Sequence, residues 1–379
     1  MSPPLPELIT ALLEPARYPH PVAGVELRES PFAWVLLAGD HAYRIAKPVR
    51  SAAVDLSTLA LRRQACEAEL RLNRRFQRPD QPATQLYLGV LPLVGTPGSP
   101  RWGVAGTDDD RRAHAFALQM RRLDPGARLD RVIGQGALTQ EHLTGLARRM
   151  AAVQARAAVA AGQQPWGHPA AAMRRPRANL ATLRAALSAP DDAGRLDLLS
   201  RWTEQRFVAI EPLLSRRRQK ERVREGHGDL SLAHLALIGD ELLPFGAIGF
   251  SEERRWIDVA SDMALTWMDL IDHGEPGLAN VWLSAWLDAS GDVSAPGIWD
   301  FFACHHAVAR ATDAAVHAGD PQASGTRQQA VDHRSRALRY LALAQDIAQP
   351  PPPRLIITHG LSGSGKTWAS GRWLQAEAS

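Results

Sequence analysis

The hydrophobic periodicity of the chain changes near Met120, and this change limits the folds that the sequence can adopt. Upstream, residues 31–49 alternate apolar and polar side chains around a Gly-Asp pair, which is typical of a β-hairpin. Two further apolar segments, 85–95 and 114–120, predict strands, and residues 57–76 carry the apolar spacing of a helix. The first part of the chain therefore predicts a small sheet with one helix.

Downstream of Met120 the pattern predicts helices. Residues 138–162 form the clearest case, with Thr139 as N-cap and Glu141 in the first turn. Further helices are expected over 176–188, 193–217, 256–272, 277–289, 298–318 and 324–348. Residues 226–250 interrupt them with a loop and a strand. An α+β fold class follows from this succession.

Composition excludes several classes of protein. The 379 residues are 45% hydrophobic and 22% charged, which fits a globular protein with a sizeable core. No apolar run is long enough to span a membrane, and the N-terminus lacks the pattern of a signal peptide. Two cysteines, Cys66 and Cys304, support neither a disulfide framework nor a cysteine metal site, so we expect a cytoplasmic protein.

The net charge of +4 is a weak signal, and no aromatic-plus-basic motif points to nucleic acid. We expect neither nucleic acid nor a membrane as a partner. The basic run over 215–225 is interpreted as a solvated helix face, with contact to phosphates as the alternative.

Lysine is rare in this chain. Of 44 basic residues only Lys47, Lys220 and Lys366 are lysines, so arginine is the default cation. A lysine carries a compact charge on a thin stem, which a guanidinium fork does not replace well. Each lysine is therefore a candidate, and Lys47 and Lys366 lie in motif-like positions.

The segment "GLSGSGKT" at 360–367 fits the phosphate-binding pattern G-x-x-x-x-G-K-[ST]. It follows the apolar "LIIT", which predicts a short strand, and precedes a plausible helix. Backbone N–H groups of the glycines would surround phosphate oxygens, the lysine would reach the β/γ-phosphates, and the threonine hydroxyl would bind Mg²⁺. The residues concerned are Gly360, Gly363, Gly365, Lys366 and Thr367.

The proline run "QPPPP" at 349–353 predicts a stiff linker and a domain boundary at about 350. Only twelve residues follow Thr367, which is too few for the further strands and the acidic residue of a P-loop domain. We expect residues 354–379 to be an incomplete P-loop segment whose C-terminal remainder is missing. A flexible Gly/Ser tail is the alternative.

The order of sheet, helical part and "HGD" loop at 227–229 is the layout of a kinase-like phosphotransferase. The chain resembles the aminoglycoside phosphotransferase-like proteins, in particular the bacterial group with a fused C-terminal P-loop ATP-binding domain. The resemblance covers nearly all of residues 18–379. It rests on "AYRIAKPV", "DLSTLALRRQACEAELRLNRR", "LYLGVLPL", "ALQMRRL", "VREGHGDLSLAHL", "RRWIDVASDMA" and the terminal "GLSGSGKT".

The resemblance implies a protein-kinase-like two-lobe fold, with a β-rich N-lobe over 1–120 and a helical C-lobe over 121–348. It also implies ATP (or GTP) and Mg²⁺ as cofactors. The implied reaction is phosphoryl transfer to the hydroxyl of a small-molecule acceptor that the sequence does not identify.

The resemblance also assigns roles in nucleotide binding. Lys47 looks like the lysine that holds the α/β-phosphates, with Arg44 as the alternative. Glu69, or else Glu67, looks like the helix carboxylate that orients this cation, while an ordinary solvated helix face is the other interpretation of both. The segment around Met120 looks like the hinge that meets the adenine.

In the loop, Asp229 looks like the catalytic base that accepts the proton of the acceptor hydroxyl. His227 would brace the loop, which agrees with its interpretation as a structural histidine. Asp258 and Asp262 resemble structural acids that cap and hold the loop from below.

The sequence departs from the family pattern at the metal site. Relatives have a sequence close to H-G-D-L-H-L-G-N. In this chain Ser231 stands in place of the second His, Ala233 in place of the Gly and His234 in place of the metal-binding Asn. Relatives then carry two acids in F-D-x-x-E-F, whereas "FGAIGF" has Gly246 and Gly249. Mg²⁺ prefers oxygen ligands, so a softer nitrogen at His234 and the loss of both acids predict a degenerate metal site.

A zinc site is a weak alternative. The segment "ACHHAV" offers Cys304, His305 and His306, but neighbouring residues on a helix point in different directions.

Three hypotheses remain. The chain is a phosphotransferase, or it is a pseudokinase-type binding or regulatory module, or activity belongs to a P-loop domain that the kinase-like part assists. Whether it is an enzyme stays open at this point.

Overall fold

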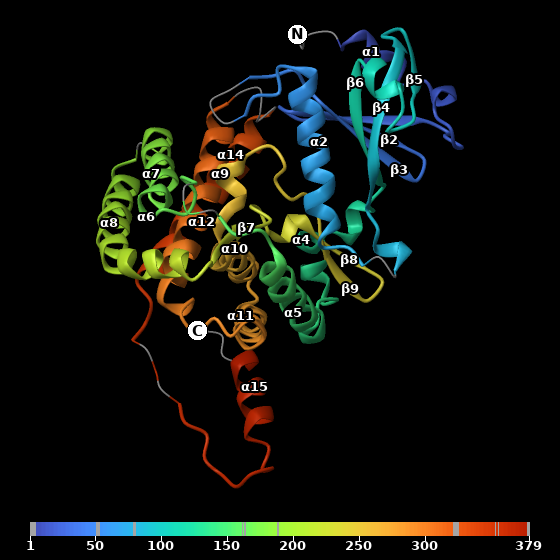
Figure 1. The fold of residues 1–379 in the computed structure, drawn as a ribbon. Coiled ribbons are helices and arrows are strands. Elements are labelled where there is room, and N and C mark those ends of the chain that lie inside the picture. Colours follow the sequence, from blue (N-terminus) through green and yellow to red (C-terminus); the bar gives the residue numbers. More distant parts are fainter. Residues whose placement is uncertain are drawn as a thin grey trace. The chain divides into compact units, whose positions relative to one another are not determined.

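The computed structural model describes residues 5–50, 54–78, 81–160, 162, 164–187, 189–320, 326–352, 354 and 356–376. The chain divides into two compact units (Figure 1). The sheet unit comprises Met1–Val132 and Ala233–Arg255, and the helical unit comprises Ile133–Leu232 and Trp256–Ser379. The predicted α+β class is confirmed. The sequence placed all of 226–250 with the helices, whereas the structure groups its larger part with the sheet.

Six antiparallel strands form the sheet in the order β1-β2-β3-β6-β4-β5. They are β1 (Val25–Glu29), β2 (Ala33–Ala38), β3 (His41–Ala46), β4 (Tyr87–Thr96), β5 (Ser99–Trp102) and β6 (Ala115–Arg121). The predicted hairpin is confirmed as β2–β3, which turns at Gly39 and Asp40. Gly39 has φ of +55°, a conformation that glycine adopts readily. The strands predicted over 85–95 and 114–120 are confirmed as β4 and β6, whereas the sequence did not indicate β1.

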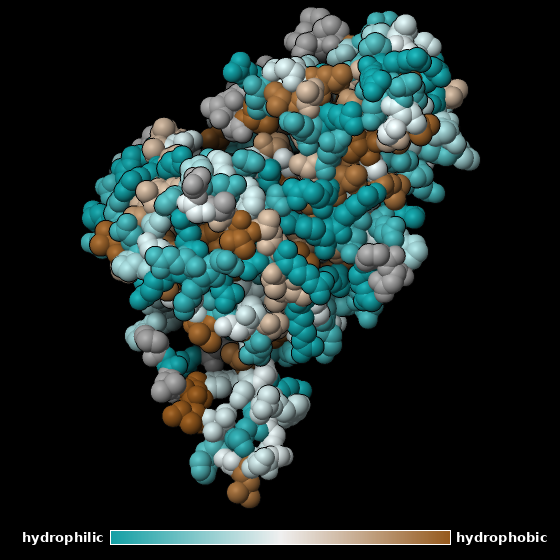
Figure 2. Space-filling model, in the orientation of Figure 1, coloured by the Kyte–Doolittle hydropathy of each residue, from teal (hydrophilic) through white to brown (hydrophobic). Residues whose placement is uncertain are grey.

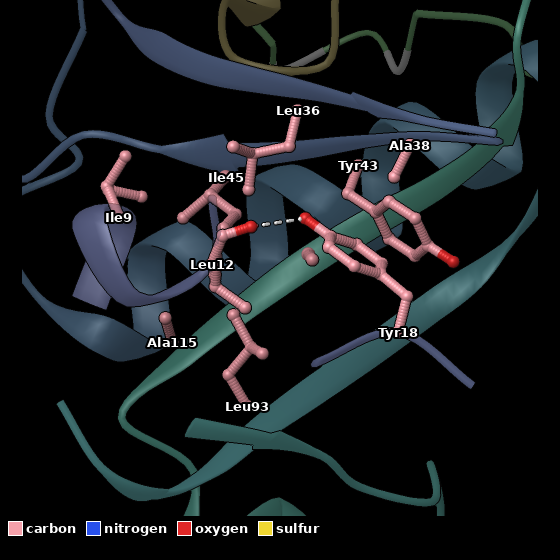
Figure 3. Close-up of a cluster of buried hydrophobic side chains, with 10 residues drawn as sticks. Ile9, Leu12, Tyr18, Leu36, Ala38, Tyr43, Ile45, Leu93 and Ala115 are labelled. Carbon is pink, nitrogen blue, oxygen red and sulfur yellow. Dashed lines mark hydrogen bonds between the residues drawn. The ribbon is translucent and has the colours of Figure 1, made fainter. Parts of the chain in front are cut away.

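The predicted helix over 57–76 is confirmed as α2 (Leu59–Arg74), and the Thr58 hydroxyl caps it by accepting from the Leu61 N–H at 3.2 Å. On one face of the sheet Cys66 of α2 packs with Tyr87 and Leu118. The opposite face carries the cluster in Figure 3, where Tyr18 donates a hydrogen bond to the Leu12 carbonyl at 2.9 Å. The sheet unit therefore has an apolar layer on each face.

The remaining elements of the sheet unit are short. They are α1 (Glu7–Ala11), α3 (Asp109–Arg112), α4 (Leu129–Val132), the antiparallel pair β8 (Leu235–Ile238) and β9 (Glu241–Pro244), and α9 (Glu252–Arg255).

Long helices make up the helical unit. They are α5 (Gln140–Arg156), α7 (Arg174–Ala186), α8 (Pro190–Gln219), α10 (Val259–Asp272), α11 (Pro276–Ser290), α12 (Pro296–Gly319) and α14 (Arg327–Ala348). Each predicted helix is confirmed, with two corrections to the bounds. Helix α5 ends at Arg156 because Ala157 has an extended backbone, and residues 256–258 of the helix predicted over 256–272 form a strand. Residues 324 and 325 of the last prediction lie outside the described residues. Shorter elements are α6 (Pro169–Ala172), α15 (Lys366–Ala376) and the antiparallel pair β7 (Val223–Glu225) and β10 (Trp256–Asp258).

Two fully buried tryptophans fix the packing of α10, α11 and α5. The indole N–H of Trp282 donates to the Met263 carbonyl at 2.9 Å, and that of Trp286 donates to Gln154 Oε1 at 2.8 Å. Burying a tryptophan costs little free energy when its one polar group, the indole N–H, forms a hydrogen bond. These bonds therefore hold the helices in one register.

The structure corrects the prediction of a strand over "LIIT". Leu355 lies outside the described residues, and residues 356–358 form no strand. A lone strand has no ladder to join, and Ile356 and Ile357 are 48% and 79% exposed. Figure 2 shows hydrophobic residues at the surface of the C-terminal segment. The helix expected after the motif is confirmed as α15. Within the described residues, no helix has the length and apolarity needed to cross a membrane.

Candidate functional site: a buried ion pair, an acid-held loop and a glycine loop

Strand β3 carries the cation of the candidate phosphate site. Tyr43 and Ile45 point into the cluster of Figure 3, and Ala46 packs with Ala65 of α2. Because strand side chains alternate between faces, Arg44 shares the α2 face with Ala46. Its Nη1 lies 2.9 Å from Glu69 Oε2, and the two side chains are only 17% and 11% exposed.

Lys47 does not make this pair, so the predicted pairing of Lys47 with Glu69 is corrected in favour of Arg44. Lys47 follows the last residue of β3 and, by the same alternation, belongs to the face away from α2. Its ammonium instead pairs with Glu29 and lies 5.2 Å from the centre of the Trp34 ring.

The two candidate glutamates of α2 differ in environment. Burial raises the pKa of Glu69, while Arg44 and His234 act in the opposite direction. Glu67 pairs with Arg63 at 2.7 Å one turn away and is 50% exposed. Glu69 is therefore the residue that orients the cation, and Glu67 lies on the ordinary solvated face.

Residues 245–250, the glycine loop, are held by neutral groups. The Gly246 N–H donates to Tyr87 Oη at 2.9 Å, and the Ala247 N–H donates to Asn73 Oδ1 at 2.9 Å. Asn73 is fully buried and donates in turn to the Glu69 carbonyl at 2.7 Å. The loop is thus fixed to α2 and β4.

Neither glycine of this loop has room for the acid that the family pattern contains. Gly246 has φ of +75°, and a Cβ there would lie 2.7 Å from Cδ2 of His234. A Cβ at Gly249 would lie 2.9 Å from the Glu69 nitrogen and 3.0 Å from the Ala65 carbonyl oxygen. The packing therefore favours glycine over a larger residue at both positions.

These residues do not fit a magnesium site. His234 offers a ring nitrogen at the position expected for a metal ligand, and its ring stands edge-on to Phe245 at 5.8 Å. Mg²⁺ wants several oxygen ligands in an octahedron. In the described part of the chain no group of three or more His, Cys, Asp or Glu side chains is arranged to hold a metal.

Met120, the predicted hinge residue, lies near the end of β6 and pairs in register with Ala42 and Tyr87. Its side chain is partly buried and packs against the cluster of Tyr87 and Leu118, as do Ile238 and Phe245. The sheet unit thus has an apolar wall at the place where the resemblance puts the adenine.

In the helical unit, the buried carboxylate of Asp262 holds residues 226–229, the acid-held loop. Asp262 is 2% exposed and accepts from the His227 N–H at 2.6 Å and from the Gly228 N–H at 2.9 Å. The Asp229 N–H faces His227 Nδ1 at 3.3 Å. His227 is fully buried, as expected for a residue that braces the loop.

The side chain of Asp229 is 20% exposed and lies 3.3 Å from Nη2 of Arg310 on α12. Arg310 also approaches the buried Asp269 at 4.0 Å, and Asp269 accepts from the Leu232 N–H at 3.0 Å. Burial raises the pKa of Asp269, mainly opposed by Arg310. A proton acceptor at Asp229 therefore has a guanidinium beside it.

Asp258 is the structural acid that the sequence indicated. It caps α10 by accepting from the Ala260 N–H at 2.9 Å. It also forms a bidentate pair with the buried Arg217 at 2.8 and 2.7 Å, and Arg217 bonds Asp292 in the same way at 2.7 and 2.8 Å.

The candidate zinc ligands are wholly or partly buried in the helical unit, where two of them form hydrogen bonds to backbone carbonyls. They are Cys304, His305 and His306. The Cys304 thiol donates to the Ala344 carbonyl at 3.5 Å. His306 Nε2 meets the Ser261 carbonyl at 2.9 Å, and burial lowers its pKa to about 3, so the ring is neutral near pH 7. Burial likewise lowers the pKa of His305.

The segment 360–367, predicted to bind phosphate, takes a loop-and-helix form. Gly363 and Gly365 have φ of +80° and +82°, and α15 begins at Lys366. The Lys366 ammonium donates back into the loop, to the Gly360 carbonyl at 2.9 Å and the Leu361 carbonyl at 2.6 Å. Thr367 is exposed on the first turn of α15.

The sequence offered Arg44 only as the alternative to Lys47, whereas the structure pairs it with Glu69. Two further features of the site were not predicted. Asn73 and Tyr87, which hold the glycine loop, could not be predicted, because helix and strand patterns do not show which loop packs on an element. Arg310 lies 81 residues beyond Asp229 on another element, and no local signal joins them.

Comparison with known proteins gives remote relatives. No protein-family model matches the chain. Uncharacterized proteins of Mycobacterium tuberculosis (strain ATCC 25618 / H37Rv) and Mycobacterium bovis are 28% identical over 354 residues, which is 92% of this chain and 65% of the relative. The chain thus spans less than two thirds of the length of these relatives.

Solved structures that resemble the chain include a choline/ethanolamine kinase family protein from Mesorhizobium loti, with a TM-score of 0.49 and 12% identity, covering 87% of this chain and 94% of that chain. Another is the GDP complex of a mutant aminoglycoside 2'-phosphotransferase-IIIa, with a TM-score of 0.46 and 15% identity, covering 89% of this chain and 97% of that chain.

Proposed function

We propose that the chain is a nucleotide-binding protein of the aminoglycoside-phosphotransferase-like type, in which the sheet unit binds the phosphates of ATP or GTP. The observation that carries the proposal is the buried Arg44–Glu69 pair at 2.9 Å. A mobile cation that a helix carboxylate fixes in place is the arrangement by which kinase-like proteins hold nucleotide phosphates.

Arg44 is suited to this role by its geometry. Glu69 engages one nitrogen of the guanidinium, and no other described residue bonds the remaining N–H groups. A planar guanidinium presents donors in a fork that matches phosphate oxygens, and such charge-assisted bonds are stronger than neutral ones. The apolar wall at Met120 and Phe245 would receive the base of the nucleotide.

Nucleotide binding by the sheet unit does not depend on Mg²⁺ in this proposal. The carboxylates that would hold the ion are glycines, and their places are filled by His234 and by the backbone of α2. Without that ion the charge of a transferring phosphoryl group is poorly offset, which costs orders of magnitude in rate. We therefore propose a binding or regulatory role with weak or no transfer.

Phosphoryl transfer to a small-molecule hydroxyl is the second candidate, and the ordered loop that carries Asp229 favours it. In that reaction the Asp229 carboxylate would accept the proton of the acceptor hydroxyl. His227 would keep the loop in position through its ring contact with the Asp229 N–H. The acceptor class is left open.

The terminal motif is a separate candidate for phosphate binding. Lys366 now satisfies two loop carbonyls, and a phosphate would compete for its ammonium. Gly360, Gly363 and Gly365 would supply backbone N–H groups, and Thr367 a hydroxyl for Mg²⁺. Activity of a P-loop domain assisted by the kinase-like part is the corresponding third possibility.

The test is the thermal stability of the whole chain carrying Lys366→Ala, which removes the lysine of the terminal motif. We expect ATP or GTP at a hundred times its dissociation constant to stabilise this variant by about 2.7 kcal/mol. The stabilisation should be nearly the same in EDTA and in Mg²⁺. Arg44→Ala should abolish it, whereas the matched variant Lys47→Ala should keep it.

Stabilisation that requires Mg²⁺, or that survives Arg44→Ala and disappears with Lys47→Ala, would overturn the proposal. The pair His234→Asn with Gly246→Asp should introduce a dependence on Mg²⁺, provided that the loop accepts both changes. For the second candidate, ADP release that is abolished by Asp229→Asn would support transfer.

A further inference from the structure

We propose that the helical unit contains a separate binding site for a small phosphate-bearing anion, between α5, β7 and α11. These elements enclose a cavity of about 260 Å³. Its charged walls are Arg148 of α5, Arg222 just before β7 and Arg224 of β7. This site is distinct from Arg44, which belongs to the sheet unit, and from the motif that contains Lys366.

The sequence brings the three arginines to one cavity by simple periodicity. Arg222 and Arg224 flank Val223, which is 4% exposed, so their side chains leave the strand on the opposite face from the valine. On α5, Arg148, Ala152 and Ala155 are spaced by four and three residues and share one helix face.

Small side chains keep the cavity open. Ala151, Ala152 and Ala155 of α5 and Ala289 of α11 line it, and none of them extends beyond a methyl group. Helices α5 and α11 pack side by side, as Figure 1 shows, and the indole of Trp286 anchors α11 to Gln154 of α5. The cavity is therefore a fixed feature between two packed helices.

Arg224 is held in place before any ligand arrives. Its Nη1 donates to the carbonyls of Ala155 and Ala157 at 2.8 and 3.0 Å, and its Nε donates to the Glu221 carbonyl at 2.8 Å. These acceptors are neutral, so they orient the guanidinium without cancelling its charge. An ordered cation loses little further entropy when it binds an anion.

The cavity has more positive than negative charge. Among the described residues, no carboxylate pairs with Arg148 or Arg224. Arg222 approaches Asp292 at 3.7 Å, but both oxygens of Asp292 already bond to the buried Arg217 at 2.7 and 2.8 Å. Guanidinium groups gathered in one cleft concentrate a positive potential, and an anion would offset their mutual repulsion.

The chemistry of the walls indicates the ligand. Guanidinium forks bind phosphate oxygens through paired, charge-assisted hydrogen bonds. The alanines and Val259 add an apolar surface for a short carbon skeleton, and the volume is near the lower end of that of small-molecule sites, about 300 Å³. A small phosphomonoester or pyrophosphate fits this description better than a whole nucleotide does.

The cavity lies close in sequence to the acid-held loop. Strand β7 ends at Glu225, one residue before the acid-held loop at 226–229. An anion bound by Arg222 and Arg224 would therefore be attached to the segment that carries His227 and Asp229.

The test is amide hydrogen exchange of the whole chain carrying Lys366→Ala, with inorganic pyrophosphate as the probe. We expect slower exchange in peptides that cover 148–157 and 221–225. Arg148→Glu places a repelling charge at an exposed position, and it should weaken the pyrophosphate affinity at these peptides at least about tenfold, equivalent to about 1.4 kcal/mol.

The matched control is Arg195→Glu, which reverses an exposed charge on α8 far along the sequence from the cavity. It should leave the affinity at these peptides unchanged. The proposal is overturned if millimolar pyrophosphate protects neither segment, if Arg148→Glu and Arg195→Glu weaken the affinity equally, or if sodium chloride at the same ionic strength gives the same protection.

Discussion

The acid-held loop of the helical unit and the glycine loop of the sheet unit are supported in opposite ways. In the first, the buried carboxylate of Asp262 accepts two backbone N–H groups at 2.6 and 2.9 Å. In the second, the neutral groups of Tyr87 and Asn73 each accept one N–H at 2.9 Å. Hydrogen bonds to a charged group contribute roughly twice as much as neutral ones.

The two loops also differ in how closely they follow the pattern that the resemblance predicts. The acid-held loop keeps both its support and the candidate base Asp229. The glycine loop lacks the carboxylates that the resemblance predicts, and its glycines are packed against His234 and the backbone of α2. Packed glycines thus stand where the resemblance predicts metal-binding acids, while the other loop carries Asp229 at the position predicted for a base.

The largest effect expected from this comparison is on stability. Asp262→Ala should lower the free energy of unfolding by about 4 kcal/mol, because two N–H groups lose a charged acceptor in a buried place. Asn73→Ala should cost about 2 kcal/mol, since it removes a neutral acceptor and a neutral donor. Urea denaturation of both variants measures the difference.

Asp288→Ala is the control, because Asp288 is exposed on α11, and such changes usually stay within about 0.5 kcal/mol. If Asn73→Ala proved as costly as Asp262→Ala, the two loops would not differ in their support as described.

The second expected effect concerns the glycines. Gly249→Ala should cost about 2 kcal/mol, because its methyl group would lie 2.9 Å from the Glu69 nitrogen and 3.0 Å from the Ala65 oxygen, which cannot move apart without distorting α2. Gly246→Ala should cost about 2 kcal/mol, from its left-handed backbone and from the His234 ring at 2.7 Å. The free energy of unfolding again gives the answer.

A double-mutant cycle isolates the role of His234. Removing the ring with His234→Ala should recover at least about 0.5 kcal/mol of the cost of Gly246→Ala and none of the cost of Gly249→Ala. Additive changes at 234 and 246 would show that His234 does not occupy the place of the missing acid.

Sequence patterns predicted the elements well and the contacts between them less well. The hairpin, α2 and the long helices followed from periodicity and, for α5, from the cap at Thr139, because both signals act within a few residues. The strand expected over 355–358 failed, because a strand needs a neighbour and the described chain supplies none there.

The candidate site shows the same limit. The sequence indicated Asp262, which holds the loop of Asp229 in the helical unit, and Glu69, which pairs with Arg44 in the sheet unit. The rarity of lysine and the resemblance favoured Lys47, whereas in the structure Arg44 pairs with Glu69. The sequence also presented Gly246 and Gly249 as simple losses, because only three-dimensional packing reveals that His234 and α2 occupy the missing side chains' places.

The smallest expected effect is the pH dependence caused by Glu69, the carboxylate beside the glycine loop. Burial raises its pKa above the ordinary value of 4.5, so the native state retains the proton more tightly than the unfolded chain does. The stability due to this group is fully present below pH 4.5 and is lost as pH rises through its native pKa.

Glu69→Gln does not titrate, so the unfolding free energy of the wild type minus that of this variant should decrease over the same interval. Arg44→Ala should enlarge the decrease, because the guanidinium no longer favours the charged carboxylate. A difference that instead grew with pH would mean that the Arg44 pair outweighs burial, and the sheet unit would then hold its charge as firmly as the helical unit does.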